Sequence, residues 1–226
     1  MLKAANYSYN TNKLPTSQTK GILALIPKGD QPKDKLTNWR PITLLSTVYK
    51  LISGVVANRI STLLPKLINS DQSGFVKGRY IGECLRTTYD IVEWAKNKQR
   101  IGLLLLIDFE KAFDSISFKY IIKTLKFFKF GQSLQKWVIL LLNNFKASIC
   151  HAGNISAQFD ILRGCRQGDP IASILFILCI EIMAIKLRGS NEIKGYKMDN
   201  LENLLSLYAD DRSIFLEYNA TNLRNS

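Results

Sequence analysis

Apolar residues form two kinds of pattern along the chain: long segments with helical spacing, which predict helices, and short runs, which predict strands. Several long segments place apolar residues three or four positions apart, on one face of a helix. Pro65 ends the first of these segments, and Gly131 separates the third from the fourth. The fifth is apolar almost throughout and is typical of a buried helix. We therefore predict helices at residues 47–64, 84–98, 117–128, 133–145 and 169–187.

Shorter apolar runs that end at turn residues predict strands. Residues 22–27 form one such run and stop at a turn that contains proline and glycine. Residues 101–107 are continuously apolar and end at Asp108, which predicts a buried central strand. Two further pairs of runs flank short turns at residues 152–154 and 208–211, and each pair predicts a hairpin.

The order of these elements predicts an α+β fold, in which helices pack on one face of a largely antiparallel sheet. The chain has 226 residues and contains no internal repeat. Residues 1–20 are polar and have no apolar period, so we expect them to form a flexible lead-in. The helical and strand segments follow from there onward.

The chain is strongly basic, and this charge limits the classes of partner that it is expected to bind. Its formal net charge is +13, and residues 1–60 hold nine basic side chains against two acidic ones. A positive surface attracts polyanions, chiefly nucleic acid or an anionic membrane surface. A basic protein without such a partner is the alternative, and charge alone does not exclude it.

Other features argue against export and against a membrane span. The first twenty residues are too polar for a signal peptide. The longest apolar stretch, residues 171–187, contains Glu181 and Lys186 and is shorter than a typical span. The four cysteines have neither paired nor metal-type spacing, which indicates reduced thiols used in packing. We expect a protein inside the cell, not secreted, and with no membrane partner. His151 is expected to be a strand residue without a chemical role.

Two acidic groups carry the candidate chemistry. Asp210 and Asp211 occupy the tip of the last predicted hairpin, and Asp108 follows the predicted central strand. If that strand lies beside the hairpin, Asp108 and Asp210 meet at one edge of the sheet. Carboxylates at close range stay ionised together only when they share a cation, and oxygen ligands select hard divalent ions. Two ions about 3.5–4 Å apart suit in-line phosphoryl transfer. A solvated turn and an isolated acid after a strand remain the alternative.

Six ordered segments resemble the reverse transcriptases of non-LTR (LINE-type) retrotransposons. The match extends from about residue 21 to residue 216, and its order makes it specific although any one segment is short. The segments are LIPK at 25–28, NWRPITL at 38–44 with YKLI at 49–52, DQSGFVKGR at 71–79, DFEKAFD at 108–114, RGCRQGDP at 163–170 and YADD at 208–211.

The resemblance implies the fingers and palm of a right-hand polymerase. It assigns residues 21–100 to a fingers-like region and residues 101–226 to a palm, and it leaves no thumb in this chain. In the palm, Asp108 would bind both metal ions, Asp210 would be the second ligand, and the main-chain carbonyl of Phe109 would reach one ion. Asp211 would complete the catalytic acids in a less committed position. The metal would be Mg²⁺, as two ions, with Mn²⁺ as a substitute.

The resemblance also implies how substrates are held. Lys28 and Arg40 would neutralise the triphosphate, while Gln167 and Gly168 would contact the incoming nucleotide and the template. Phe113 would be a steric gate that excludes a ribose 2′-hydroxyl, with simple core packing as its alternative. Residues expected to contact the nucleic-acid backbone are Lys50, Lys77, Arg79 and Arg163.

The implied activity is RNA-directed DNA synthesis by nucleotidyl transfer. The partners would be an RNA template with a DNA primer and deoxynucleoside triphosphates, in a ribonucleoprotein of the nucleus or cytoplasm. A polymerase that copies RNA into RNA is disfavoured by Phe113. The sequence leaves open the oligomeric state and the template specificity.

Departures from the family pattern support an alternative function. Arg212 follows the acid pair at a position where the family normally has an apolar or small residue. Its charge could sit exposed or could disturb the packing of the hairpin, and it could also alter the metal site, since a cation there competes with metal for the carboxylates. Together with the missing thumb, the arginine at this position indicates an incomplete or decayed copy of a retrotransposon. The alternative is a non-catalytic nucleic-acid-binding remnant of the same fold.

Overall fold

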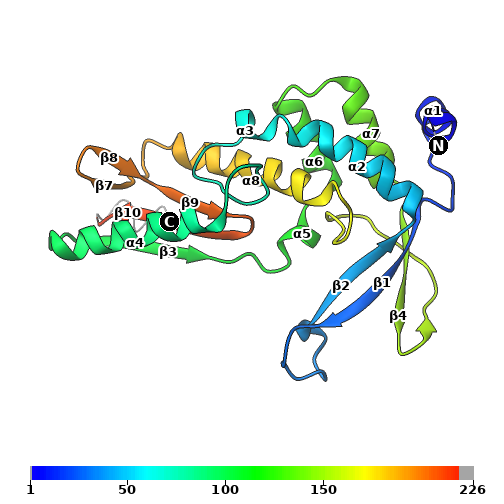
Figure 1. Cartoon of the computed structure of the whole chain (residues 1–226), viewed down its shortest axis with the longest axis horizontal. Coiled ribbons are helices and arrows are strands. Elements are labelled where there is room, and N and C mark those ends of the chain that lie inside the picture. Colours follow the sequence, from blue (N-terminus) through cyan, green and yellow to red (C-terminus); the bar gives the residue numbers. More distant parts are fainter. Residues whose placement is uncertain (1, 219–226) are drawn as a thin grey trace. The chain divides into compact units, whose positions relative to one another are not determined.

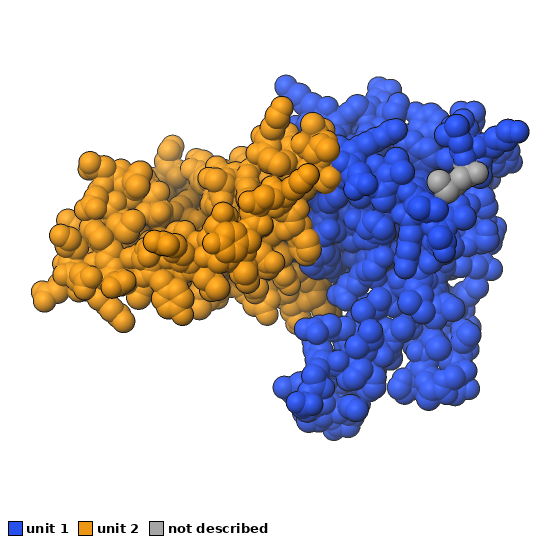
Figure 2. Space-filling view, in the orientation of Figure 1, with its two compact units in different colours: residues 1–60, 113–176 blue, residues 61–112, 177–226 orange. Residues whose placement is uncertain are grey.

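The chain divides into two compact units, each assembled from two separate stretches of sequence. The computed structural model describes residues 2–218. Unit 1 consists of residues 1–60 and 113–176, and unit 2 consists of residues 61–112 and 177–226 (Figure 2). These units do not coincide with the fingers-like region and palm expected on either side of residue 100, because long-range packing joins stretches that are distant in sequence, and that assignment stays a prediction. The end of the predicted palm, residues 219–226, lies outside the described residues.

Unit 1 is built around a mixed sheet. Strand β1 (Lys20–Pro27) pairs antiparallel with β2 (Trp39–Leu45) and parallel with β4 (Lys146–His151). The short strands β5 (Asn154–Ile155) and β6 (Phe159–Asp160) both pair with β4. Figure 1 shows β1 and β2 as a long ribbon with β4 beside β1.

Strand β2 was not predicted from the sequence. Its proline, Pro41, weakens the strand signal because proline has no backbone N–H for a sheet ladder. The structure accommodates Pro41 because β2 is an edge strand in the described part of the sheet. A short 3-10 helix, η1 (Leu36–Asn38), leads into β2.

The helices of unit 1 begin at the N-terminus. They include α1 (Leu2–Thr11), α2 (Thr47–Ser61), α6 (Phe118–Phe127) and α7 (Gln132–Leu142). Helix α1 lies within the stretch expected to be a flexible lead-in, so residues 2–11 have a regular structure that their polar pattern did not predict. Its Tyr9 hydroxyl donates to Ser133 Oγ at 3.0 Å, and its ring lies 5.4 Å from that of Trp137. This contact with α7 holds α1 in place, although the polar sequence of α1 has no apolar pattern that predicts a packed helix.

Unit 2 contains a three-stranded antiparallel sheet in its described residues, in the order β3-β10-β9. The strands are β3 (Gly102–Ile107), β9 (Leu205–Tyr208) and β10 (Asp211–Glu217). Side chains alternate across β10, so Ile214 and Leu216 pack with Ala184 while Phe215 faces Ile91. One face is thus covered by helix α8 (Ala172–Arg188), as expected. Helix α4 (Ile81–Asn97) covers part of the other face, which the sequence did not indicate.

Strand β3 differs from its prediction. It lies at the edge of the described sheet, not at its centre. Leu103 and Leu105 pack against the core, whereas Leu106 is 73% exposed. A continuous apolar run does not distinguish a strand that is buried on both faces from one that is buried on one face.

Smaller elements complete the described chain. Unit 2 also contains α3 (Leu64–Leu67) and a ribbon of β7 (Tyr196–Met198) and β8 (Leu201–Asn203), and α5 (Ala112–Ser115) spans a boundary between the units in the sequence. The cysteines form no disulfide, and His151 ends β4. Among the described residues, no helix combines the length and the apolar character needed to cross a membrane.

Candidate active site

The last hairpin places the acid pair at a tight two-residue turn. Tyr208 pairs with Asp211, so Ala209 and Asp210 form the turn. Ala209 has a φ of +56° although it is not glycine, and it is buried. A positive φ at the first central position is what a primed hairpin turn requires. The predicted hairpin is confirmed, and its tip carries a backbone conformation that its neighbours must support.

Sheet pairing brings the third acid to the same edge. Ile107 at the end of β3 pairs with Arg212 on β10, so Asp108 emerges next to the acid pair. Burial raises the pKa of Asp211 above its usual range, and the negative charges of Asp210 and Asp108 raise it further. The three carboxylates therefore interact electrostatically, as expected for acids that meet at one sheet edge.

Arg212, the next residue on β10, is buried and feels the charges of all three acids. Its guanidinium carbon lies 3.6 Å from the centre of the Phe109 ring. The side chain is 2% exposed, and none of its three nitrogens has a hydrogen-bond partner among the described residues. Burial lowers the pKa of Arg212 to about 10, while the charges of Asp210, Asp108 and Asp211 act in the opposite direction. The site thus contains its own cation.

The donor atoms at this edge are of the kind that a divalent metal prefers. Asp108, Asp210 and Asp211 offer carboxylate oxygens, which suit hard cations. Their mutual repulsion, visible in the raised pKa of Asp211, is relieved by a bound cation. Within residues 2–218, however, no three acidic, histidine or cysteine side chains converge into a ready metal cage. The donor chemistry fits a divalent ion, and the carboxylates would have to draw together around it.

Unit 1 holds the residues predicted to contact a nucleotide. The backbone of Lys28 donates to the Asn38 carbonyl at 2.8 Å, and Ile26 pairs with Arg40. Lys28 and Arg40 therefore project from the same end of the β1-β2 ribbon, and both are exposed.

The loop that carries Gln167 and Gly168 is attached to this ribbon. Thr43 N donates to the Gln167 carbonyl at 2.8 Å. Gly168 has a φ of +101°, and a Cβ there would lie 2.7 Å from the Thr43 carbonyl oxygen. Only glycine permits both the conformation and the close approach.

A buried polar network fixes that loop, and the sequence reasoning missed it. Arg166 pairs with Asp169 at 3.3 Å, and both side chains are almost fully buried. Tyr49 donates to Asp169 Oδ2 at 2.7 Å, Ser53 also bonds this carboxylate, and Arg166 donates to the Leu141 carbonyl at 2.6 Å. Burial raises the pKa of Tyr49 well above its usual value. The available signal was a pair of opposite charges three residues apart, Arg166 and Asp169, within the RGCRQGDP segment.

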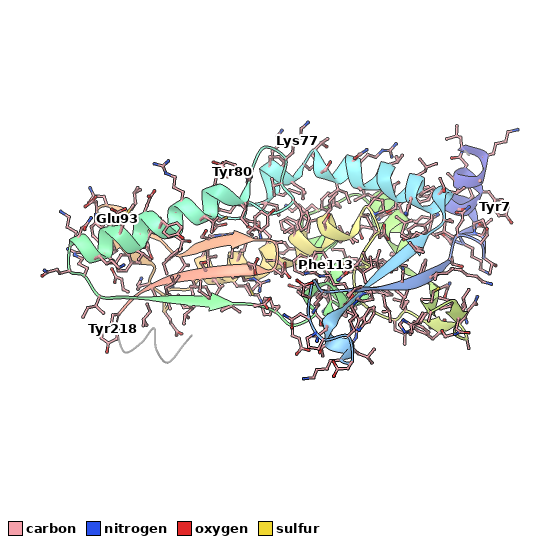
Figure 3. All side chains as sticks on the ribbon, turned by 60° about the horizontal axis from the view of Figure 1, so that its bottom comes forward. Tyr7, Lys77, Tyr80, Glu93, Phe113 and Tyr218 are labelled. Atoms are coloured by element: carbon pink, nitrogen blue, oxygen red, sulfur yellow. The ribbon has the colours of Figure 1, made fainter. Side chains whose placement is uncertain are left out.

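Phe113 packs within unit 1 and stays partly accessible. Its ring stacks on Phe176, with centres 4.1 Å apart and planes 14° apart. Its carbonyl accepts from Cys165 N at 2.7 Å, which ties it to the loop of residues 163–170. The stacking supports core packing on one face of the ring, and the role of the other face as a gate stays a prediction. Figure 3 labels Phe113 beside its neighbouring side chains.

The residues predicted to contact a nucleic-acid backbone have different environments. Lys50, Lys77 and Arg163 are exposed, and Figure 3 shows Lys77 at the surface. Arg79 instead donates to the carbonyls of Ile68, Asn69 and Gln72. Its guanidinium is thus engaged with its own loop, while its contact with nucleic acid stays a prediction.

The predicted residues divide between the units. The acids Asp108, Asp210 and Asp211, with Phe109 and Arg212, belong to unit 2, where the sheet brings them together. The predicted nucleotide contacts belong to unit 1 and gather at the β1-β2 ribbon and the loop attached to it.

Carboxylates at a hairpin tip and at the end of the adjacent strand are the arrangement expected in the palm of a nucleic-acid polymerase. Comparison with known families narrows this class: the model of the reverse transcriptase (RNA-dependent DNA polymerase) family matches residues 26–224, and the chain belongs to this family. The resemblance stated from the six sequence segments is confirmed.

Curated relatives come from non-LTR retrotransposons. The chain is 32% identical to the transposon TX1 149 kDa protein of Xenopus laevis over 90% of its length. It is 29% identical over 96% of its length to the Pol polyprotein of the type-2 element R2DM of Drosophila melanogaster. It spans only 16% and 20% of these two proteins. The match therefore concerns one domain of much longer proteins.

Solved structures support the predicted fold. Apo telomerase of Candida tropicalis, truncated from its C-terminal domain, matches 99% of this chain and 50% of its own, with a TM-score of 0.60 and 12% identity. A telomerase of Candida albicans in complex with a telomeric RNA fragment matches with a TM-score of 0.59 and 12% identity. At this identity the likeness shows the fold alone, and that fold is the expected polymerase fingers and palm.

Proposed function

We propose that this domain catalyses RNA-directed DNA synthesis. The observation that carries the proposal is the meeting of Asp108 with Asp210 and Asp211 at one edge of the unit 2 sheet, in a chain of the reverse transcriptase family. A primer 3′-hydroxyl would attack the α-phosphate of a deoxynucleoside triphosphate, and pyrophosphate would leave. Positioning and charge neutralisation account for most of the acceleration in such transfers.

The proposed cofactor is Mg²⁺, as two ions, with Mn²⁺ as a substitute. Asp108, Asp210 and the Phe109 carbonyl are the proposed ligands. When bound, the metal would supply charge neutralisation and an acidified primer hydroxyl. Lys28 and Arg40 would balance triphosphate charge from the β1-β2 ribbon, Arg as a fork and Lys as a point charge. The glycine backbone at Gly168 would let a nucleotide approach closely.

The proposed partners are an RNA template, a DNA primer and deoxynucleoside triphosphates. The net charge of +13 supports binding to a nucleic-acid backbone. Base pairing supplies the sequence information, so the domain need only hold the duplex by its phosphates.

Single-nucleotide incorporation tests this proposal. The chain is mixed in stoichiometric amount with a DNA primer on an RNA oligonucleotide, one complementary deoxynucleotide and Mg²⁺, and the extended primer is measured. We expect extension that Asp108→Asn reduces at least about a hundredfold. Asp90→Asn is the matched control, because Asp90 is an exposed acid on α4 that pairs with Arg86 at the surface. Absence of extension, or equal extension by Asp108→Asn, would overturn the proposal.

Arg212 favours a second candidate function, a nucleic-acid-binding domain without catalysis. Its buried positive charge lies among the three acids and opposes the binding of a divalent cation. Under this alternative the chain binds an RNA–DNA duplex in a salt-sensitive manner, and neither Mg²⁺ nor nucleotide changes that affinity. Nucleotide-dependent metal binding separates the two candidates.

A further inference from the structure

A loop from a distant part of the sequence, residues 69–79, pairs with the outer edge of strand β9 in the hairpin that carries the acid pair. Leu207 N donates to the Asp71 carbonyl at 2.8 Å, and Ser73 N donates to the Leu207 carbonyl at 2.8 Å. Gln72 thereby forms a parallel bridge with Leu207. Strand β9, which leads into the acid pair, is held on one side by β10 and on the other by this loop.

The side chain of Gln72 reaches the turn itself. Gln72 is 1% exposed, and its Oε1 accepts from Gly74 N at 2.8 Å and from Ala209 N at 3.1 Å. Ala209 is the buried residue with positive φ that immediately precedes Asp210. A buried backbone N–H without a partner is costly, so the Gln72 amide supports the one unusual backbone conformation at the hairpin tip.

Gly74 provides independent support for this contact. A Cβ at Gly74 would collide with the Ala209 backbone nitrogen and would lie 2.9 Å from Ala209 Cα. Glycine therefore allows the loop and the turn to approach at backbone distance, which places the Gln72 amide within reach of Ala209.

The loop is rigidly held at both of its ends. The Arg79 guanidinium donates to the carbonyls of Asn69 at 2.5 Å and of Gln72 at 2.7 Å. Arg188 donates to Asp71 Oδ2 at 2.7 Å and also pairs with Glu181. Because these ion pairs and carbonyl contacts hold the loop in place, the loop can restrict the position of the turn that it contacts.

We propose that Gln72 is a positioning residue for the catalytic acids. By accepting from Ala209 N, its amide fixes the turn, and the turn fixes where Asp210 and Asp211 present their carboxylates. A neutral acceptor suits this position because a carboxylate would add a further negative charge beside the acids. This inference rests on the proposed function for its catalytic consequence, whereas the hydrogen bond that it concerns can be measured without catalysis.

Amide hydrogen exchange tests the contact directly. Gln72→Met keeps the length of the side chain but removes the acceptor. We expect the Ala209 amide to exchange at least about tenfold faster in Gln72→Met than in the wild type. Val76→Ala is the control, because Val76 is buried in the same loop and its truncation lowers stability without removing the acceptor. The two variants are compared under conditions in which their free energies of unfolding are equal. Equal exchange rates of the Ala209 amide in Gln72→Met and Val76→Ala would then overturn the inference.

Metal binding and incorporation kinetics test the consequence. With Mn²⁺ as the probe, we expect Gln72→Met to weaken binding about tenfold and to slow incorporation by about ten- to a hundredfold, with little change in KM for the nucleotide. Gln72→Glu, which restores an acceptor, should recover the slow Ala209 exchange. If the wild type incorporates no nucleotide while Gln72→Met still speeds Ala209 exchange and weakens Mn²⁺ binding, the proposed function fails and the positioning role stands. Unchanged Mn²⁺ affinity in Gln72→Met would overturn the positioning role.

Discussion

The guanidinium of Arg212 lies over the ring of Phe109, 3.6 Å from its centre, within the electrostatic influence of the candidate catalytic acids. The ring supplies a cation–π contact, which is one of the few favourable interactions available to a buried cation. The three nitrogens of Arg212 have no hydrogen-bond partner within residues 2–218. The stacking therefore offsets only part of the cost of removing the charge from water.

Replacing Arg212 by methionine should stabilise the protein. An apolar side chain of similar length keeps the contact with Phe109 and removes a desolvated charge, so we expect a gain of about 1–3 kcal/mol in the free energy of unfolding. Urea denaturation measures it. Arg100→Met is the matched control, since Arg100 lies over Trp94 at 5.7 Å but is exposed. A loss of stability in Arg212→Met would show that the buried cation is favourable.

The same substitution should strengthen binding of a divalent cation. Removing one positive charge beside Asp210 leaves the carboxylates with less internal neutralisation, so Mn²⁺ should bind about tenfold or more tightly to Arg212→Met. Titration of Mn²⁺ followed by electron paramagnetic resonance measures this. Arg100→Met should bind like the wild type, and so should Arg212→Met if its charge does not reach the acids.

Breaking the buried pair of Arg166 and Asp169 should be strongly destabilising. Asp169→Ala removes the counter-charge of the buried guanidinium and the carboxylate that accepts from the Tyr49 hydroxyl, and we expect a loss of about 3–5 kcal/mol. The exposed pair of Arg86 and Asp90 is the comparison, and Asp90→Ala should cost less than about 1 kcal/mol. Thermal and urea denaturation of both variants measure the contrast. Equal losses would contradict the role assigned to the network.

Glu181 should make the stability depend on pH in the acidic range. Burial raises the pKa of Glu181, and Arg188 opposes the rise without cancelling it. The folded state therefore holds this proton more tightly than the unfolded state does. Stability from this group is greatest below the ordinary glutamate pKa of about 4.3 and falls as pH rises through the folded value. Glu181→Gln should flatten that part of the profile. Glu93 is exposed (Figure 3), so Glu93→Gln should leave the profile unchanged. A steeper slope in Glu181→Gln would refute the assignment.

Phe113→Val should relax discrimination against ribonucleotides. If the accessible face of the ring lies under the sugar, a smaller side chain admits a 2′-hydroxyl, and the preference for deoxynucleotides should fall at least about tenfold. Competitive single-nucleotide incorporation measures the ratio of kcat/KM values. Unchanged selectivity with lower stability would instead assign Phe113 to packing against Phe176 alone.

Local patterns predicted much of the fold. The predicted long helices correspond to α2, α4, α6, α7 and α8, with ends shifted by a few residues, because apolar spacing reports burial directly. The final hairpin formed where turn residues interrupt two apolar runs. Strand β2 and helix α1 were missed because one contains a proline and the other is polar, and both depend on contacts with distant partners.

The sequence by itself determined the family, the acid pair at a hairpin tip and the position of Asp108 after a strand. These features depend on residue type and short spacing, which a linear chain displays. Only the tertiary structure placed the Gln72 amide on Ala209, 137 positions away, and buried Arg212 on Phe109. Such contacts produce no periodic pattern in the sequence, because the partners meet only when sheet pairing and loop closure bring distant segments together.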